Sequence, residues 1–279
     1  MSGSMLAFVL NDGLMKILFA DWSIYQAIFL RGILTIPLML FFAWKAKQLV
    51  VKLSSSDWKL IVIRTASEVG AAIFFLSALA HMPLANVTAI LQVLPLAVTM
   101  GAAIFLRESV NWRRWLAIFV GFIGVMIIVR PGMEGFSVYS ISALCAVACV
   151  TVRDLTTSRL SSKTPSMFVA LITGIAMTVL GAVMLPTITW EPIYKSHWLI
   201  LAISAIAIIF GYLFSVMAMR YGDASFIAPF RYTAMLWAII IGILLFNDWP
   251  DQLTLMGTTI IVATGIYSFY REKLQRVAS

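Results

Sequence analysis

Residues 60–106 read LIVIRTASEVGAAIFFLSALAHMPLANVTAILQVLPLAVTMGAAIFL, which is two long apolar runs joined by the short link HMP at 81–83. Each run is long enough to cross a bilayer as a helix, which takes roughly 20 mostly apolar residues. A transmembrane β-barrel would instead show alternating segments of about ten residues. The stretch therefore predicts an all-α integral membrane protein.

The composition of the whole chain supports this prediction. Of 279 residues, 62% are hydrophobic and 11% are charged, whereas soluble domains usually carry about 25% charged residues. The loops between the apolar runs are too short to hold a soluble domain. Ten predicted spans lie at 4–20, 23–44, 60–81, 84–106, 112–129, 138–158, 167–187, 197–220, 224–246 and 253–270.

The net charge of +8 indicates orientation rather than nucleic-acid binding, because the basic residues are scattered instead of forming one patch. Only Arg130 and Lys195 fall on one side of the predicted spans. Basic loops face the cytoplasm, so both termini are expected there. The basic residues on the cytoplasmic side are Lys45, Lys47, Lys52, Lys59, Arg107, Arg113, Arg114, Arg159, Lys163, Arg220, Arg271, Lys273 and Arg276.

The two halves of the chain resemble each other when one is shifted by about 140 to 142 residues. Each half has five spans, and because five is odd the second half enters the membrane from the other side, as in inverted-repeat transporters. We expect one repeat at 1–132 and a second at 133–279, which ends in a short basic tail. The aligned pairs are Asp12 with Asp154, Ser23 with Pro165, Gly32 with Gly174, Trp58 with Trp198 and Glu108 with Asp248.

Eight charged residues fall inside the predicted spans. A charge at the bilayer centre costs about 2.5 to 3.5 kcal/mol, so each must be paired, hydrated or close to an interface. Arg64 and Lys16 lie near enough to a boundary to extend to the membrane surface. The eight are Asp12, Lys16, Arg31, Arg64, Glu68, Arg153, Asp154 and Arg231, which leaves a surplus of two positive charges.

Intrahelical pairing is a structural alternative for some of these charges. Asp12 with Lys16, and Arg64 with Glu68, are spaced four residues apart, so each pair could neutralise itself on one helix face.

Arg153 and Asp154 are neighbours that point about 100° apart on a helix. We therefore expect that they do not pair with each other and that at least one has a partner on another span. Asp154 occupies the repeat position of Asp12, so both carboxylates are predicted to face a shared cavity.

Two proline breaks add candidate site residues. Gln92 lies in the middle of a span, three residues before a proline that frees a backbone carbonyl. The stretch PFRY (229–232) combines a break, a cation and two aromatic rings. Arg231 could clamp a carboxylate while a ring stacks on Phe230 or Tyr232. The alternative is a simple kink in which Arg231 pairs with a carboxylate of the protein.

Motifs for other chemistry are missing from the sequence. There is no phosphate-binding GxxxxGK[ST] and no metal-binding HExxH spacing, so we expect no cofactor and no metal. Cys145 and Cys149 are expected only to pack, and His81 and His197 have no evident nucleophile beside them. Residues 1–5 carry no positive charge, so no signal peptide is expected. A membrane enzyme or a structural subunit stays as the less favoured alternative.

Six stretches resemble the EamA-type members of the drug/metabolite transporter superfamily, and within it the S-adenosylmethionine uptake transporters of intracellular bacteria. The resemblance implies two five-helix repeats around a central cavity that is lined by the first, third, fourth, sixth, eighth and ninth spans. Family members usually carry more apolar residues before the position of Asn11, which leaves the depth of Asp12 open. The stretches are LNDGLMK (10–16), FLRG (29–32), HMPLANVTAILQVLPL (81–96), FLRESVNWRRWLAIFVGFIGVMIIVRPG (105–132), RYGDASFIAPFRYTAMLWAIIIG (220–242) and FNDWPDQLTLMG (246–257).

The resemblance and the charges together predict a bacterial inner-membrane transporter for a small polar or zwitterionic metabolite, such as an amino acid or S-adenosylmethionine, that works by alternating access. An exporter of amino acids or drug-like amphiphiles is the alternative. The direction of transport and the oligomeric state stay open, and a monomer is compatible with the sequence. Asp12 or Glu68 is the expected proton-coupling group. The predicted substrate-binding residues are Asp12, Arg31, Glu68, Gln92, Arg153, Asp154, Phe230, Arg231 and Tyr232.

Overall fold

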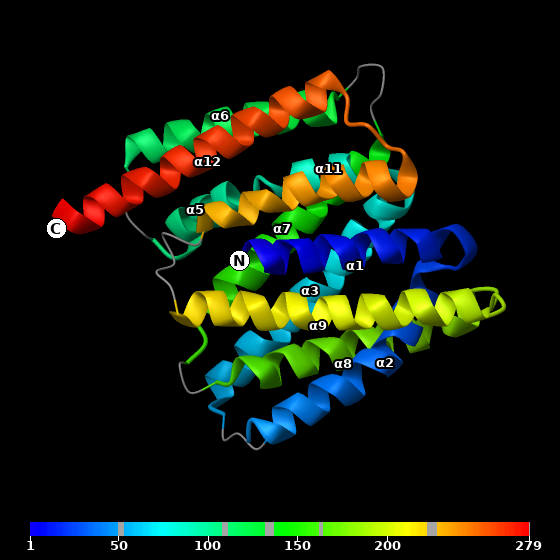
Figure 1. Cartoon of the computed structure of the whole chain (residues 1–279). Coiled ribbons are helices and arrows are strands. Elements are labelled where there is room, and N and C mark those ends of the chain that lie inside the picture. The colour runs from blue at the N-terminus through cyan, green and yellow to red at the C-terminus, as the bar shows by residue number, and fades with distance from the viewer. Residues whose placement is uncertain (50–52, 108–110, 132–136, 162–163, 222–227, 279) are drawn as a thin grey trace.

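The computed structural model describes residues 1–49, 53–107, 111–131, 137–161, 164–221 and 228–278, and within these ranges the regular structure is entirely helical. The helices run roughly along one direction as a bundle (Figure 1). They are α1 (Ser2–Asp21), α2 (Ile24–Lys45), α3 (Ser55–His81), α4 (Leu84–Leu91), α5 (Leu94–Phe105), α6 (Trp112–Val129), α7 (Val138–Ser158), α8 (Ser166–Met184), η1 (Leu185–Thr187), α9 (Lys195–Tyr221), η2 (Ala228–Tyr232), α11 (Thr233–Phe246) and α12 (Gln252–Ala278).

The membrane-spanning architecture is confirmed. Within the described ranges, nine spans are long and apolar enough to cross a bilayer, with α4 and α5 counted as one, and the shorter apolar stretch Phe230–Phe246 supplies a tenth. Residues 224–227 of the predicted ninth span, Glu108 and the predicted repeat boundary after residue 132 lie outside the described residues.

The third span begins at Ser55 rather than at residue 60, because a capping serine precedes it. The Oγ of Ser54 accepts a hydrogen bond from the backbone N–H of Asp57 at 3.0 Å. Such a bond satisfies one of the free donors at a helix start, and it extends the helix beyond the apolar run.

Two spans are broken at repeat-related places. The fourth span is divided between α4 and α5 at Gln92 and Val93, and the ninth consists of the 3₁₀ turn η2 followed by α11. Arg107 and Asn247, which are 140 residues apart, follow α5 and α11 with left-handed φ values of 56° and 55°. The predicted breaks and the repeat alignment thus agree with the backbone.

The packing of the helices shows the inverted repeat directly. The repeat relates α1 to α7, α2 to α8, α3 to α9 and α6 to α12. In the bundle α1 packs against α9 and α3 packs against α7, so these two contacts are images of each other. The pairs α2 with α8 and α6 with α12 are each their own image, and they lie at opposite edges of the bundle (Figure 1).

Glycines lie where the self-related pairs cross. A Cβ at Gly257 of α12 would lie 2.5 Å from the carbonyl oxygen of Gly124 in α6. A Cβ at Gly32 of α2 would lie 2.0 Å from the Oγ1 of Thr178 in α8. Small residues therefore permit these close crossings, as is common between membrane helices.

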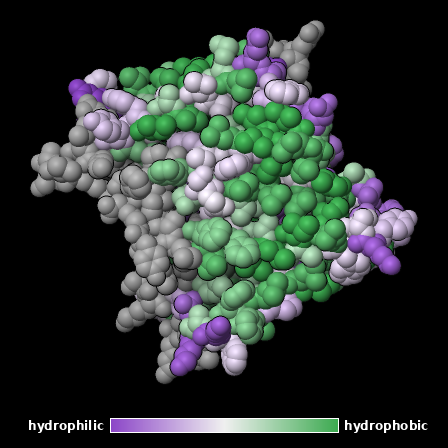
Figure 2. Space-filling view, in the orientation of Figure 1, coloured by the Kyte–Doolittle hydropathy of each residue, from purple (hydrophilic) through white to green (hydrophobic). Residues whose placement is uncertain are grey.

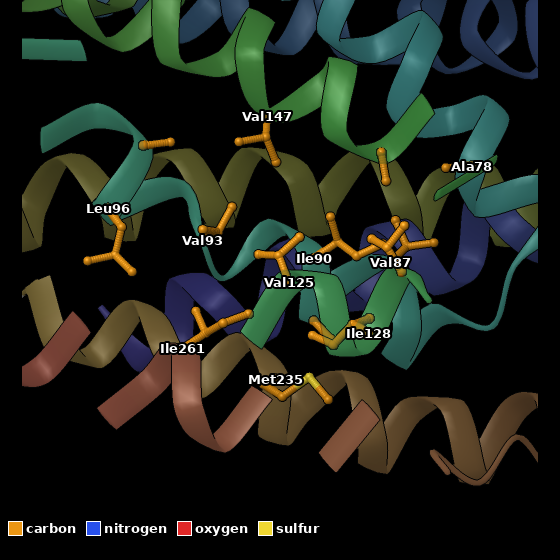
Figure 3. Packing of buried hydrophobic residues seen from close by; sticks show 14 of the residues in the cluster. Ala78, Val87, Ile90, Val93, Leu96, Val125, Ile128, Val147, Met235 and Ile261 are labelled. Atoms are coloured by element: carbon orange, nitrogen blue, oxygen red, sulfur yellow. The ribbon is translucent and has the colours of Figure 1, made fainter. Parts of the chain in front are cut away.

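Apolar side chains fill the interior and also cover the outside. Val87, Ile90, Val125 and Ile261 of α4, α6 and α12 are fully buried in a cluster to which α3, α5, α7 and α11 also contribute (Figure 3). On the coloured part of the face seen in Figure 2, apolar residues dominate the middle and hydrophilic ones gather at the margins. An exposed apolar band of this kind is expected where a protein faces lipid tails.

Candidate functional site

A polar network at membrane depth centres on Asn11 of α1. The Oδ1 atom of Asn11 accepts hydrogen bonds from the Nη1 of Arg31 at 3.1 Å and from the Oγ of Ser204 at 2.8 Å. Its Nδ2 donates to the Oδ1 of Asp12 at 3.0 Å. Asn11 is only 2% exposed, so this amide joins α1, α2 and α9 inside the bundle. We call Asn11, Asp12, Arg31 and Ser204 the first network.

A second network joins α3, α7 and α8. The Nη1 of Arg153 lies 2.9 Å from the Oε2 of Glu68, and its Nη2 lies 2.8 Å from the Oδ1 of Asp154. On α3, Arg64 donates from Nε to the Oγ1 of Thr157 at 3.0 Å and from Nη1 to the Oγ1 of Thr173 at 2.7 Å. We call Arg64, Glu68, Arg153, Asp154, Thr157 and Thr173 the second network.

The two networks occupy repeat-related positions. Four positions of the first network correspond to four of the second when the sequence is shifted by 140 or 142 residues, although the side chains mostly differ. The repeat therefore places a polar network at corresponding positions in both halves of the chain. The corresponding positions are Asn11 with Arg153, Asp12 with Asp154, Arg31 with Thr173, and Ser204 with Arg64.

The expectation that Arg153 and Asp154 do not pair with each other is wrong. Both Nε and Nη2 of Arg153 contact the Oδ1 of Asp154, at 2.9 and 2.8 Å. The two side chains leave the helix in different directions, but the arginine chain is long enough to fold back. The expected partner on another span is present, because Arg153 also binds Glu68 of α3.

The proposed intrahelical pairs are not formed. Glu68 pairs with Arg153 of α7 instead of Arg64. Lys16 turns away from Asp12, donates to the backbone carbonyl of Met82 and lies 3.8 Å from the Oδ2 of Asp248.

The negative charge beside Lys16 belongs to Asp248, which lies outside the predicted spans and was not counted with the eight charges. The Nζ of Lys16 also lies 5.1 Å from the centre of the Phe246 ring. This leaves a surplus of one positive charge at depth rather than two. Among the described residues no carboxylate forms an ion pair with Arg231, so the kink in which Arg231 pairs with the protein has no support there.

The remaining predicted site residues lie at the two helix breaks. Gln92 is 6% exposed and ends α4. Phe230 and Arg231 lie in η2, where the Phe230 side chain is exposed. Tyr232 is 5% exposed, and a Cβ at Gly265 of α12 would lie 1.7 Å from its hydroxyl. The Tyr232 ring is therefore packed against α12 and is not free to stack on a ligand.

Sequence reasoning missed Tyr212 of α9. It lies within electrostatic range of Arg31 in the first network and of Arg64, Glu68 and Arg153 in the second. Its ring meets Phe8 of α1 edge-on, with 5.3 Å between the centroids. A tyrosine in an apolar span carries no distinctive signal, so only the fold reveals that it lies near both networks.

Within the described ranges, no group of three or more His, Cys, Asp or Glu side chains could hold a metal ion. Cys145 and Cys149 are free thiols on α7 and are partly buried.

A model of the EamA-like transporter family matches residues 1–130 and, a second time, residues 138–270. A solved crystal structure shares the fold with a TM-score of 0.62 at 18% identity, covering 100% of this chain and 99% of the other.

Several curated proteins are similar in sequence. An S-adenosylmethionine uptake transporter of Rickettsia conorii is 28% identical over 199 residues, which span 68% of this chain and 65% of that relative. A riboflavin transporter of Vibrio cholerae is 30% identical over 191 residues, covering 67% of this chain and 63% of the relative. A pseudopaline exporter of Pseudomonas aeruginosa is 26% identical over 227 residues, covering 79% and 78%. The chain thus spans less than two thirds of the length of the first two of these relatives.

Proposed function

Since the chain belongs to the EamA-like transporter family, we propose that it carries a small polar or zwitterionic metabolite across the bacterial inner membrane by alternating access. The family is one of transporters rather than enzymes. The names of the relatives cover S-adenosylmethionine, riboflavin and pseudopaline, and each of these molecules is small and polar.

The observation that carries this proposal is the pair of repeat-related polar networks in an otherwise apolar bundle. Side chains of the second network are partly exposed, with 24% for Arg153, 16% for Glu68 and 25% for Asp154. Charged groups that face lipid at this depth would be costly, so their exposed surface is best explained by a polar path inside the protein. Charges near the midplane of inverted repeats are typical of substrate and ion sites.

In this proposal the substrate lies between the networks and exchanges charge contacts with both. Arg31 uses one guanidinium N–H for Asn11, and its other donors can take a carboxylate. Glu68 and Asp154 share the single ion-pair partner Arg153, so their carboxylates can also take an amine or a sulfonium. Gln92, Phe230 and Arg231 would contribute from the breaks, and the buried Tyr232 would support η2.

Of the two candidate carboxylates, Asp12 is better placed than Glu68 to couple transport to protons. The Oε2 of Glu68 forms an ion pair with the Nη1 of Arg153, so adding a proton to Glu68 would weaken that pair. Within the part of the chain that the structure describes, the Asp12 carboxylate accepts a hydrogen bond from the amide of Asn11 and forms no ion pair. A pH gradient would then drive uptake in the parent protein and lose its effect in Asp12→Asn.

We also propose that both termini face the cytoplasm, as the basic loops indicate, and that the repeats divide after residue 132. Export is the second candidate, and the similarity to a pseudopaline exporter favours it. Inside-out and right-side-out vesicles distinguish the two directions.

A thermal-shift screen of metabolites on the purified protein tests the binding part of the proposal, because a ligand that binds the folded state stabilises it. We expect a shift with at least one small zwitterion in the parent protein and none in Glu68→Gln. A shift of equal size in the variant would contradict the assignment of Glu68, and a metabolite panel without any shift would contradict the proposed substrate class.

A further inference from the structure

Helices α3 and α7 hold each other from one end of the bundle to the other. At the end where the chain termini lie, the backbone N–H of Ser161 donates to the Oδ1 of Asp57 at 3.1 Å. At the opposite end the rings of His81 and Tyr139 stack, with 3.9 Å between the centroids. Between these ends lie the contacts Arg64 with Thr157, Glu68 with Arg153, and Phe74 with Ser142.

Helices α1 and α9 are joined in the same continuous way. The Oγ of Ser4 donates to the carbonyl oxygen of Gly211 at 2.7 Å near the terminal end, and the Nε2 of His197 lies 3.0 Å from the Oδ2 of Asp21 at the other. Phe8 with Tyr212 and Asn11 with Ser204 lie between them.

Each pair also holds a third helix. Arg31 of α2 donates to Asn11, and the side-chain amide of Gln26 binds the backbone of Glu191, just before α9, through both its Nε2 and its Oε1, at 2.8 and 3.0 Å. On the other side Arg64 reaches Thr173 of α8. The two groups of three helices are therefore built by repeat-related contacts.

We infer that the chain moves as two units, α1 with α2 and α9, and α3 with α7 and α8, and that the substrate passes between them. Each unit mixes helices from both repeats, so the repeats do not rock against each other as blocks. The inference rests on the proposed function and concerns which helices move together. If α3 left α7, Arg153 would lose Glu68 at membrane depth, where a charge without its partner is costly.

The units meet where α2 crosses α8. There a Cβ at Gly181 would lie 2.9 Å from the backbone nitrogen of Phe29. Because Gly32 and Gly181 present bare backbone to Thr178 and Phe29, small residues form this crossing, and it can act as a pivot. Lys16, which reaches from α1 to the carbonyl of Met82 at the end of α3, is a contact between units and must open during movement.

A native cysteine allows a direct test. A Cβ at Gly70 of α3 would lie 3.4 Å from the Sγ of Cys149 in α7, with no other atom within 4 Å. The Sγ of Cys149 is therefore within reach of a cysteine at position 70, because an S–S bond of about 2.05 Å holds the Cβ of one cysteine roughly 3 Å from the Sγ of the other. Gly70→Cys in a Cys145→Ala background therefore links α3 to α7 on mild oxidation. The matched control also carries Cys149→Ala and cannot form the link.

Uptake into proteoliposomes is compared before and after oxidation. If α3 and α7 move together, the linked protein keeps the rate of the reduced protein. Loss of uptake on oxidation, restored by reductant and absent from the control, would overturn the inference. A bifunctional maleimide that joins Lys16→Cys to Pro83→Cys in a cysteine-free background ties the two units and is expected to stop uptake; continued uptake would also overturn it.

Failure of the proposed function has a different signature, because it removes uptake from the reduced protein as well. A measurement that needs no substrate then tests whether the helices of each unit move together. Fluorotryptophan NMR detects exchange between conformers, which continues in the α3–α7-linked protein if the inference holds and stops if the two helices must separate.

Discussion

Replacing Asn11 with alanine is expected to weaken the first network by an amount that follows from its contacts. Asn11 makes two interhelical hydrogen bonds, to Arg31 and to Ser204. Such bonds in membrane proteins average about 0.6 kcal/mol and reach about 1.7 kcal/mol. The two bonds together predict a loss of about 1 to 3 kcal/mol in the free energy of unfolding. The loss should lie towards the upper end of this range, because Asn11 is buried and its replacement leaves Arg31 without an acceptor.

The assay is reversible unfolding in mixed micelles of detergent and lipid, followed by circular dichroism. Ser204→Ala removes one bond only, so it should cost about 0.6 to 1.7 kcal/mol. The double variant should lose less free energy of unfolding than the two single variants lose together, because both substitutions remove the same bond between Asn11 and Ser204. Strict additivity, or an Asn11→Ala variant as stable as the parent, would refute the assignment of Asn11 as the centre of the network.

Three further predictions concern other contacts. Gly257→Leu should lower stability by about 1–3 kcal/mol or more, because its Cβ meets the α6 backbone at 2.5 Å, whereas Gly70→Ala should leave the thermal midpoint nearly unchanged. Gln26→Leu should free the segment before α9, seen as faster hydrogen exchange there; unchanged protection would contradict its two backbone bonds. Partial burial acts to raise the pKa of Asp251, but bonds from the Thr254 N–H and the Arg130 side chain outweigh it, so the pKa lies below its ordinary value. The folded protein therefore favours the charged carboxylate of Asp251, and the contribution of this carboxylate to stability is lost as pH falls below about 4. The stability of Asp251→Asn should therefore fall less steeply at acid pH than that of the parent protein.

Hydropathy predicted most of the fold, because lipid imposes a simple rule on sequence. A helix that crosses a bilayer must form the hydrogen bonds of its backbone within itself and present apolar side chains to lipid, so the spans can be recognised from the sequence. Prolines marked the breaks after Gln92 and at η2 for the same local reason. The early start of α3 was not predicted, because Ser54 extends the helix beyond the apolar run.

The site was less predictable, because its contacts join helices that are distant in sequence. Asp12 and Asp154 could be aligned by the repeat, but Ser204 and Thr173 could not be distinguished from ordinary serines and threonines of a membrane helix. Their roles depend on the packing of α9 against α1 and of α8 against α3. The pairing of Arg153 with Asp154 was missed, because helical angles describe where side chains leave the backbone and not where a long one ends.

Uptake of labelled metabolites by purified protein in proteoliposomes tests the central claim most directly. S-adenosylmethionine, riboflavin and zwitterionic amino acids form the panel, and Arg153→Ala that remains folded serves as the control. The account predicts saturable uptake of at least one of these compounds by the parent protein and loss of that uptake in the variant. Uptake by the parent no faster than by protein-free liposomes, or equal uptake by the variant, would contradict it.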